Sequence, residues 1–290
     1  MSDLGGIDMC YREGKDEFSE CMNDTKVPKQ ILVIPDIHGR RFWREPVHRM
    51  IDDVDRVAFL GDYLDPYPDE GVVYSPEELR QNLTEIVALK QEQPEKVVLL
   101  KGNHDQHYAS EKFRETGCGT RFDRLRCRDY HKFFNDHAAL FKLVHKERVG
   151  EQTYVFSHAG ITMYWLHKVN SMVWHLADNK ISLSDDEVIE RINALDDCGI
   201  GQEMLAVVGR SRSFLGEKTG SVLWADIDEH SIPHSHNAYG LNQVFQVFGH
   251  TRLDGSMMDM IEYDNLAMVD SQRCFLVDEA STSKILPLDI

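Results

Sequence analysis

Five short runs of apolar residues recur along the chain, and each is followed directly or within a few residues by Gly, Asp or His. The runs are rich in Val, Ile, Leu and Phe. Continuous apolar runs of this length are typical of strands in a sheet that is covered on both faces. We therefore expect a sheet whose strands include residues 31–34, 57–60, 97–100, 154–156 and 244–248.

Two capping boxes predict helices between these strands. Ser75 is followed by Pro76, which suits the first helical position, and by Glu78 three residues after the cap. A helix is expected from there to about residue 91. Ser184 and Glu187 open a second helix in the same way. The order strand, helix, strand predicts an α/β layered fold.

The length of the chain and its apolar content predict one large domain. With 290 residues and 42% hydrophobic content, the chain can bury a substantial core. Residues 1–28 are polar and mixed in charge, so we expect a loosely ordered extension before a single domain at 29–290. The stretch 161–220 has helical patterning and several aromatic residues. It is either a helical cap beside the active site or an ordinary helical connection.

Charge and composition exclude several classes of protein. With a formal net charge of -17, we do not expect the chain to bind nucleic acid through a basic face. A phosphate-bearing substrate would need local positive charge, and bound divalent ions can supply it. No C-x-x-C pair and no N-terminal apolar run after a basic segment are present, so we expect a reducing, cytoplasmic setting. The apolar runs are much shorter than the roughly 20 residues that span a bilayer, and no membrane span is expected.

Metal-binding side chains follow the first three predicted strands. Asp36 and His38 are two residues apart, so in extended backbone they point the same way and can share one ion. Asp62 and Asn103 follow the next two strands, at the carboxyl edge of the predicted sheet. A carboxylate such as Asp62 suits a bridging position, because two divalent ions about 3.5–4 Å apart repel each other. Asn103 offers a neutral carbonyl oxygen to the second ion.

Two histidines, His158 and His250, come directly after later apolar runs. Neutral imidazole favours Mn, Fe, Zn or Co over Mg alone as the bound metal. A single polar residue after a strand is more often a cap or turn residue than a ligand. Five such strand endings in one chain reverse that preference and indicate a centre of two divalent transition-metal ions.

These segments together resemble the calcineurin-like metallophosphoesterases, whose motifs run D-x-H, G-D, G-N-H-[DE], a later His and G-H. All five occur here in that order. The resemblance implies a four-layer α/β/β/α sandwich with a helical insertion. It implies that the first ion is held by Asp36, His38 and Asp62. The second ion would be held by Asp62, Asn103, His158 and His250, and manganese is the metal we favour.

Other segments are similar to the Ser/Thr phosphoprotein phosphatases within this family. Residues 61–65 are similar to their G-D-Y-V-D-R-G segment, and residues 223–226 are similar to L-W-S-D. In that subgroup the later Asp orients the His of G-N-H, so the resemblance assigns Asp65 to His104. The final motif has Arg252 where many phosphodiesterases have a second His.

The resemblance therefore predicts a phosphomonoesterase that acts on a phosphoprotein or a small phosphoester. A hydroxide bridging the two ions would be the nucleophile, and His104 would be the general acid. A phosphodiesterase or dinucleoside polyphosphate hydrolase is the alternative, because the same centre serves both reactions in the family. A non-catalytic scaffold is the remote alternative, because such a module would be expected to have lost ligands. No nucleic-acid or membrane partner is expected.

The chain departs from the phosphatase pattern at the residue that binds phosphate. Pro66 stands where that motif has Arg, and Pro35 precedes Asp36 where Gly is usual. Another arginine is needed, since a guanidinium matches the geometry of phosphate oxygens. Arg210 and Arg212 are the candidates. An equally good interpretation is that both are solvated arginines of a loop that do not bind substrate. The remaining polar residues that we considered are Arg40 and Arg252 as weaker candidates, His107 as a residue behind the ligands, and His234 to His236 as a surface loop.

Overall fold

Two β-sheets form the centre of the molecule. The computed structural model describes residues 29–116, 121–175, 183–231, 241, 243–253 and 259–289. The predicted extension at 1–28 and the segment His234 to His236 lie outside the described residues. One sheet has six strands in the order β11-β10-β1-β2-β3-β4, and the other has five in the order β5-β6-β7-β9-β8.

The six-stranded sheet contains the first three predicted strands as parallel neighbours, and β10 pairs with β1 in the antiparallel direction. Its strands are β1 (Gln30–Ile34), β2 (Arg56–Phe59), β3 (Val97–Leu100), β4 (Phe141–Lys142), β10 (Phe275–Asp278) and β11 (Leu286–Pro287).

The five-stranded sheet contains the last two predicted strands. Here β6, β7 and β9 are parallel, whereas β5 and β8 pair at the two edges in the antiparallel direction. Its strands are β5 (Val144–Val149), β6 (Gln152–Ser157), β7 (Val244–Phe248), β8 (Ile261–Tyr263) and β9 (Leu266–Met268).

The alternation of side chains along β1 explains why the sheet is buried on both faces. Ile31 and Val33 point into the core between the two sheets, where they lie in one cluster with Phe156 and Val247. Leu32 and its equivalents point the other way, into the core under the helices. Because side chains alternate along a strand, an apolar run without interruption supplies both layers at once.

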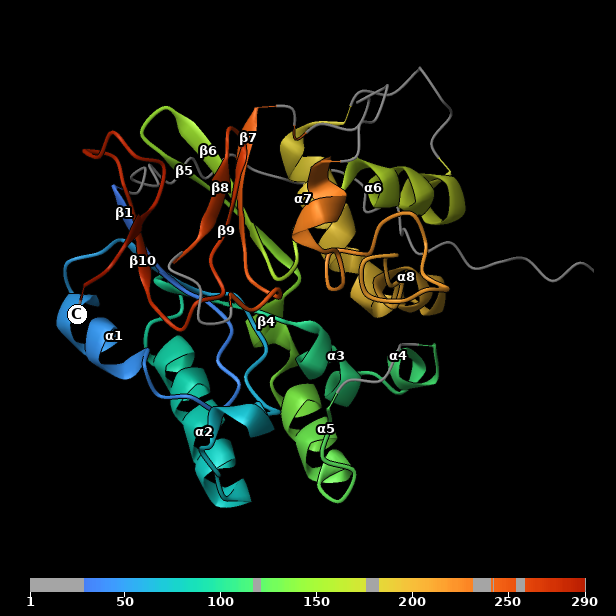
Figure 1. Ribbon diagram of the computed structural model, residues 1–290, viewed down its shortest axis with the longest axis horizontal. Helices are drawn as coiled ribbons and strands as arrows, with labels where there is room; N and C mark the ends of the chain where they lie inside the picture. Colours follow the sequence, from blue (N-terminus) through green and yellow to red (C-terminus); the bar gives the residue numbers. More distant parts are fainter. Residues whose placement is uncertain are drawn as a thin grey trace, which may run out of the picture.

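Helices cover the outer face of each sheet (Figure 1). The six-stranded sheet is covered by α1 (Arg44–Met50), α2 (Pro76–Glu92), α3 (Asn103–Ala109) and α5 (Cys127–Asp136). The five-stranded sheet is covered by α6 (Met163–Val169), α7 (Asp185–Asn193) and α8 (Gly199–Leu205), and α4 (Glu111–Thr116) contacts α8. This confirms the expected four-layer α/β/β/α sandwich. None of the described helices has the length and apolar character needed to cross a membrane.

Short helical segments connect these elements. They are η1 (Pro68–Glu70), η2 (Ala138–Leu140), η3 (Asn170–Trp174), η4 (Ala194–Asp197) and η5 (Ile227–Ser231). The described helices between residues 161 and 220 form the outer layer on the five-stranded sheet. The role of this stretch as a cap stays a prediction.

The two predicted capping boxes are present at α2 and α7. The Ser75 hydroxyl accepts a hydrogen bond from the Glu78 N–H at 3.2 Å, and the Glu78 carboxylate accepts one from the Ser75 N–H at 2.7 Å. Ser184 and Glu187 make the same reciprocal pair. Helix α2 ends at Glu92, one residue beyond the expected end.

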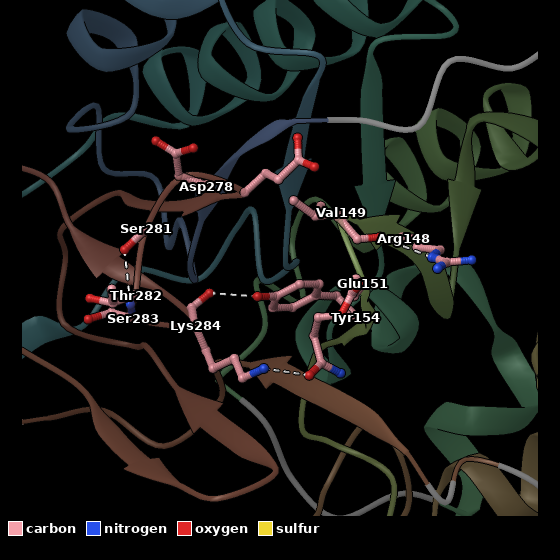
Figure 2. A pocket seen from close by; sticks show the side chains of 12 residues that line it. Arg148, Val149, Glu151, Tyr154, Asp278, Ser281, Thr282, Ser283 and Lys284 are labelled. Carbon is pink, nitrogen blue, oxygen red and sulfur yellow. Dashed lines mark hydrogen bonds between the residues drawn. The ribbon is translucent and has the colours of Figure 1, made fainter.

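The strand directions bring the polar strand ends together and leave a separate cleft at the other end of β6 (Figure 2). That cleft is lined by residues around the start of β6 and by the segment after β10. The Tyr154 hydroxyl donates to the carbonyl of Lys284 at 3.0 Å, and the Lys284 ammonium donates to Gln152 at 2.6 Å. The carboxyl end of β6, which is followed by His158, lies at the other end of the strand from this cleft.

Candidate metal centre

The backbone at the strand ends adopts conformations that side chains rarely allow. Positive φ angles occur at His38 (45°), Asp62 (51°), Asp65 (61°) and His250 (70°), all of them residues that the sequence marks as functional. Such left-handed residues carry strain of about 1–3 kcal/mol each and cluster at functional sites. Three of them, His38, Asp62 and His250, also carry candidate ligand atoms that lie close together.

Asp36, His38 and Asp62 form the first cluster. All three are buried, and their potential ligand atoms lie within 4.8 Å of one another. His38 Nδ1 donates a hydrogen bond to the carbonyl of Leu64 at 2.9 Å, which leaves the lone pair on Nε2. That Nε2 atom is buried without a hydrogen-bond partner among the described residues and lies 3.4 Å from Asp62 Oδ2. A cation between them would satisfy both atoms.

Asp62, His158 and His250 form the second cluster, also within 4.8 Å. His158 Nδ1 donates to the carbonyl of Leu60 at 3.0 Å, so Nε2 carries the lone pair. This Nε2 lies 2.9 Å from Asn103 Oδ1 and 3.0 Å from His250 Nδ1. Electron-rich atoms therefore converge on one point, which a metal ion would stabilise. Asp62 belongs to both clusters and therefore lies between the two sets of candidate ligands.

Burial controls the protonation of these groups. It lowers the pKa of His38 and of His250 well below the ordinary value, and it lowers that of His158 as well. Neutral imidazole is the form that binds a metal. Burial acts to raise the pKa of Asp62, but the neighbouring histidines outweigh it and lower the value to about 2. Imidazole rings and carboxylates in one buried group are a set of donors that fits divalent metal ions.

Two glycines allow the carboxylates to approach the neighbouring strand ends. A Cβ atom at Gly102 would collide with the Asp62 carboxylate, and one at Gly249 would collide with the Asp36 carboxylate. Glycine is therefore required at both positions by packing. The G-N-H and G-H motifs each begin with such a glycine.

Asp105 ties two of the strand ends together. Its carboxylate accepts hydrogen bonds from the N–H groups of Asp62 at 2.7 Å, Tyr63 at 2.9 Å and Gly102 at 2.8 Å. These donors belong to the turns that follow β2 and β3. The buried carboxylate thereby fixes Asp62 relative to the start of α3.

His104 and Asp65 are paired, in the arrangement that the resemblance implies. His104 Nδ1 lies 2.7 Å from Asp65 Oδ2, and the other Asp65 oxygen accepts a hydrogen bond of 2.6 Å from the Tyr108 hydroxyl. The His104 N–H donates to Asp62 Oδ1 at 3.0 Å. With Nδ1 occupied by Asp65, Nε2 is the ring nitrogen that remains for a substrate atom.

The two predicted phosphate-binding arginines lie in different surroundings. Arg212 Nη2 donates to the Thr251 hydroxyl at 2.6 Å, and it lies 3.2 Å from Asp226 Oδ2 and 3.4 Å from the carbonyl of His250. The structure therefore brings Arg212 to the second cluster. Arg210 is exposed, and within the described ranges no hydrogen bond or ion pair joins it to a ligand residue. Its role stays a prediction.

Arg40 and Arg252 lie on the side of the first cluster. The Arg40 guanidinium donates to the carbonyl of Asp36 at 3.2 Å and to both carboxylate oxygens of Glu70 at 3.0 and 2.6 Å. Arg252 donates to both oxygens of Asp69, at 3.2 and 2.7 Å. Each of these guanidinium groups is already paired with a carboxylate.

Several residues near the centre were missed by the sequence analysis. Tyr108 holds Asp65 through a hydrogen bond that no strand-end rule could indicate. Asp270 lies two residues after β9, is fully buried, and has no hydrogen-bond partner for either oxygen within the described residues. Burial raises its pKa to about 7. The run 266–269 followed by Asp is the same pattern that marked the other strand ends, and it could have identified Asp270.

His107 lies behind the site on α3. Its ring stacks on Phe122 with the centroids 4.8 Å apart and meets Phe113 edge-on at 5.7 Å. Burial lowers the pKa of His107 to about 4. The ring packs among aromatic side chains on the same helix that begins with Asn103 and His104.

Comparison with known proteins identifies the family. The sequence model of the calcineurin-like phosphoesterases matches residues 29–251. The chain therefore belongs to the calcineurin-like phosphoesterase family, and it is a phosphoester hydrolase with the fold of that family. Members of the family bind divalent metal ions and act on phosphorylated substrates, and the two clusters described above are the candidate ligands.

The solved structures that the chain matches include two phosphatases. One is a mutant of a cold-active protein tyrosine phosphatase, with 14% identity, a TM-score of 0.46, and coverage of 86% of this chain and 75% of that one. Another is a protein serine/threonine phosphatase from Saccharomyces cerevisiae with similarity to human phosphatase PP5. It has 15% identity, a TM-score of 0.46, and coverage of 92% and 80%. No curated protein matches the chain.

Proposed function

We propose that this chain is a metal-dependent phosphomonoesterase that acts on a phosphoprotein or a small phosphoester. The observation that carries the proposal is the 2.7 Å hydrogen bond between His104 Nδ1 and Asp65 Oδ2, directly beside the ligand clusters. A proton donor at this place suits a leaving group that departs as a poor alkoxide, such as a serine or sugar oxygen.

The chain would hold two divalent transition-metal ions, with manganese as the favoured metal. Asp36, His38 and Asp62 would hold the first ion. Asp62 would be shared with the second ion, whose other ligands would be Asn103, His158 and His250. When bound, the ions neutralise phosphate oxygens and lower the pKa of water to about 7, so that a nucleophile forms at neutral pH.

His104 would donate a proton to the leaving oxygen. Asp65 keeps the His104 ring in one orientation, because its carboxylate accepts the hydrogen on Nδ1 and directs Nε2 outward. Tyr108 in turn holds the second Asp65 oxygen at 2.6 Å. Two hydrogen bonds thus link Tyr108, Asp65 and His104 and hold the His104 ring in place for one proton transfer.

Arg212 would bind a phosphate oxygen on the side of the second ion. Its guanidinium lies beside His250 and Thr251, and its side chain is 27% exposed, so it can reach a ligand in the site. Arg252 supports monoester chemistry in a different way. It stands where many diesterases have a second histidine, and it is paired with Asp69.

A comparison of two substrates tests the proposal. Manganese-loaded protein should hydrolyse p-nitrophenyl phosphate faster than bis-p-nitrophenyl phosphate under the same conditions. A clear preference for the diester would overturn the monoesterase proposal and favour a phosphodiesterase. Metal analysis after reconstitution tests the enzyme itself: fewer than one manganese ion per chain would favour a non-catalytic scaffold.

A further inference from the structure

The arginines near the candidate centre differ in the acidic side chains with which they pair. Three arginines near the clusters each form an ion pair with one carboxylate. Arg121, in contrast, forms no ion pair with a carboxylate in the part of the chain that the structure describes, and the residue is exposed. Without such an ion pair, the Arg121 guanidinium can donate hydrogen bonds to an anion that enters the site. The three ion pairs are Arg40 with Glu70, Arg252 with Asp69, and Arg212 with Asp226.

Arg121 is fixed next to the position where an arginine is missing. Its Nη2 donates a hydrogen bond of 3.1 Å to the carbonyl of Asp65, and the next residue in the chain is Pro66. Pro66 occupies the position at which the related phosphatase motif has its arginine. Arg121 comes from a distant loop, yet its guanidinium reaches the same turn.

Tyr67 connects Arg121 with the first ligand cluster. The Arg121 guanidinium carbon lies 3.7 Å from the centroid of the Tyr67 ring, which is within the range of a cation–π contact. The same ring meets the His38 ring edge-on with the centroids 4.6 Å apart. When a guanidinium stacks on an aromatic face, its N–H groups point outward in the guanidinium plane, parallel to the ring. There they can donate to an oxyanion.

We propose that Arg121 binds the phosphate of the substrate and replaces the arginine that the related motif has at the position of Pro66. Tyr67 is the positioning residue that holds the Arg121 guanidinium beside His38. This proposal rests on the proposed function. Arg121 would meet phosphate oxygens on the side of the first ion, opposite to Arg212 on the side of the second. A guanidinium fork donates two parallel hydrogen bonds to such oxygens.

Binding of inorganic phosphate to the manganese-loaded full chain tests the role of Arg121. Isothermal titration calorimetry with Arg121→Ala should give a dissociation constant about 10- to 100-fold above that of the wild type, because a hydrogen bond to a charged group is lost. Arg124→Ala is the matched control. Arg124 lies in the same loop, over the Phe122 ring at 5.9 Å, and its loss should leave phosphate affinity unchanged.

Two substitutions at Tyr67 separate positioning from general damage to the fold. Tyr67→Phe keeps the aromatic face and should stay within about twofold of the wild type in phosphate affinity. Tyr67→Leu removes the face and should weaken phosphate binding about 3- to 10-fold. Thermal unfolding midpoints of all variants should match the wild type, which shows that the affinity changes come from the site.

Equal phosphate affinity of Arg121→Ala and the wild type would overturn the proposal, as would an equal loss in Arg124→Ala. Absence of phosphate binding by the loaded wild type would overturn it too. The outcome is separable from the proposed function, because the measurement involves no turnover. A preference for the diester substrate would reject the monoesterase while the phosphate titration still decides the role of Arg121.

Discussion

At the scale of single residues, the centre depends on side chains in unusual backbone conformations. His38, Asp62, Asp65 and His250 all have positive φ angles. An ordinary side chain is disfavoured there, so the surrounding contacts must hold each residue in place. Asp62 shows how this is done, since Asp105 accepts a hydrogen bond from its N–H at 2.7 Å.

The role of His104 predicts a dependence on the leaving group. His104→Asn removes the proton donor that we propose, so hydrolysis of a phosphoserine peptide should fall by about 10²- to 10⁴-fold. Hydrolysis of p-nitrophenyl phosphate should fall much less, because nitrophenolate leaves without a proton. Steady-state kinetics on both substrates measures the difference. His48→Asn, at an exposed position on α1, is the control, and equal losses of His104→Asn on both substrates would reject the general-acid role.

At the scale of elements, the turns after β2 and β3 are joined by one buried carboxylate. Asp105 accepts three N–H groups from these turns, and it is fully buried. A side chain that cannot accept from all three donors leaves a buried N–H group without a partner. The two turns should then lose their fixed separation.

Asp105→Asn should therefore lower the free energy of unfolding by about 2–4 kcal/mol, because the amide has one acceptor oxygen for three donors. Urea unfolding of the metal-free protein measures the change. Asp52→Asn, at an exposed position after α1, should stay within about 0.5 kcal/mol of the wild type. A loss below about 1 kcal/mol for Asp105→Asn would contradict the proposed support.

The elements near the centre could be predicted from the sequence because their signals are local. Residues 97–100 and 244–248 are strands with those same bounds, and the capping Ser75 begins α2 as expected. Strands β4 and β11 have two residues each and carry no periodic pattern. Strand β10 pairs with β1 across most of the chain length, which is a tertiary contact that no local pattern specifies.

In the candidate centre, too, local sequence patterns could be predicted and tertiary contacts could not. The six predicted ligand residues follow apolar strands, so a local pattern placed them at one edge of the sheets. Tyr67 and Arg121 reach the site from loops, and Tyr108 reaches Asp65 from the far end of a helical turn. Their positions depend on how the loops fold over the sheet edge. Sequence spacing carries no information on such contacts.

At the scale of the whole molecule, stability should depend on pH through buried neutral histidines. Burial lowers the pKa of His230 to about 4, and its Nε2 donates to the carbonyl of Ala159 at 3.1 Å. In the unfolded chain a histidine has a pKa of about 6.5. Between these values the unfolded state binds the proton and the folded state does not, so stability falls as the pH falls.

The contribution of His230 can be isolated by substitution. As the pH falls from 6.5 to 5.5, protonation of His230 in the unfolded chain should lower the free energy of unfolding of the wild type by about 1 kcal/mol. His230→Gln keeps a donor toward Ala159 but does not titrate, so the variant should lose about 1 kcal/mol less than the wild type over this interval. Urea unfolding with EDTA at the two pH values measures both. Parallel pH profiles of variant and wild type would contradict the assignment.

The position of the centre across both sheets has a mechanical consequence. The core between the two sheets is apolar, and apolar contacts have little directional preference. The ligand residues come from both sides: Asp36, His38, Asp62 and Asn103 follow strands of one sheet, whereas His158 and His250 follow strands of the other. Metal–ligand bonds are directional, so bound ions would add to the hydrogen bond from His158 to the carbonyl of Leu60 in holding one sheet against the other. Bound metal would then contribute to the stability of the sandwich as well as to the chemistry that we propose.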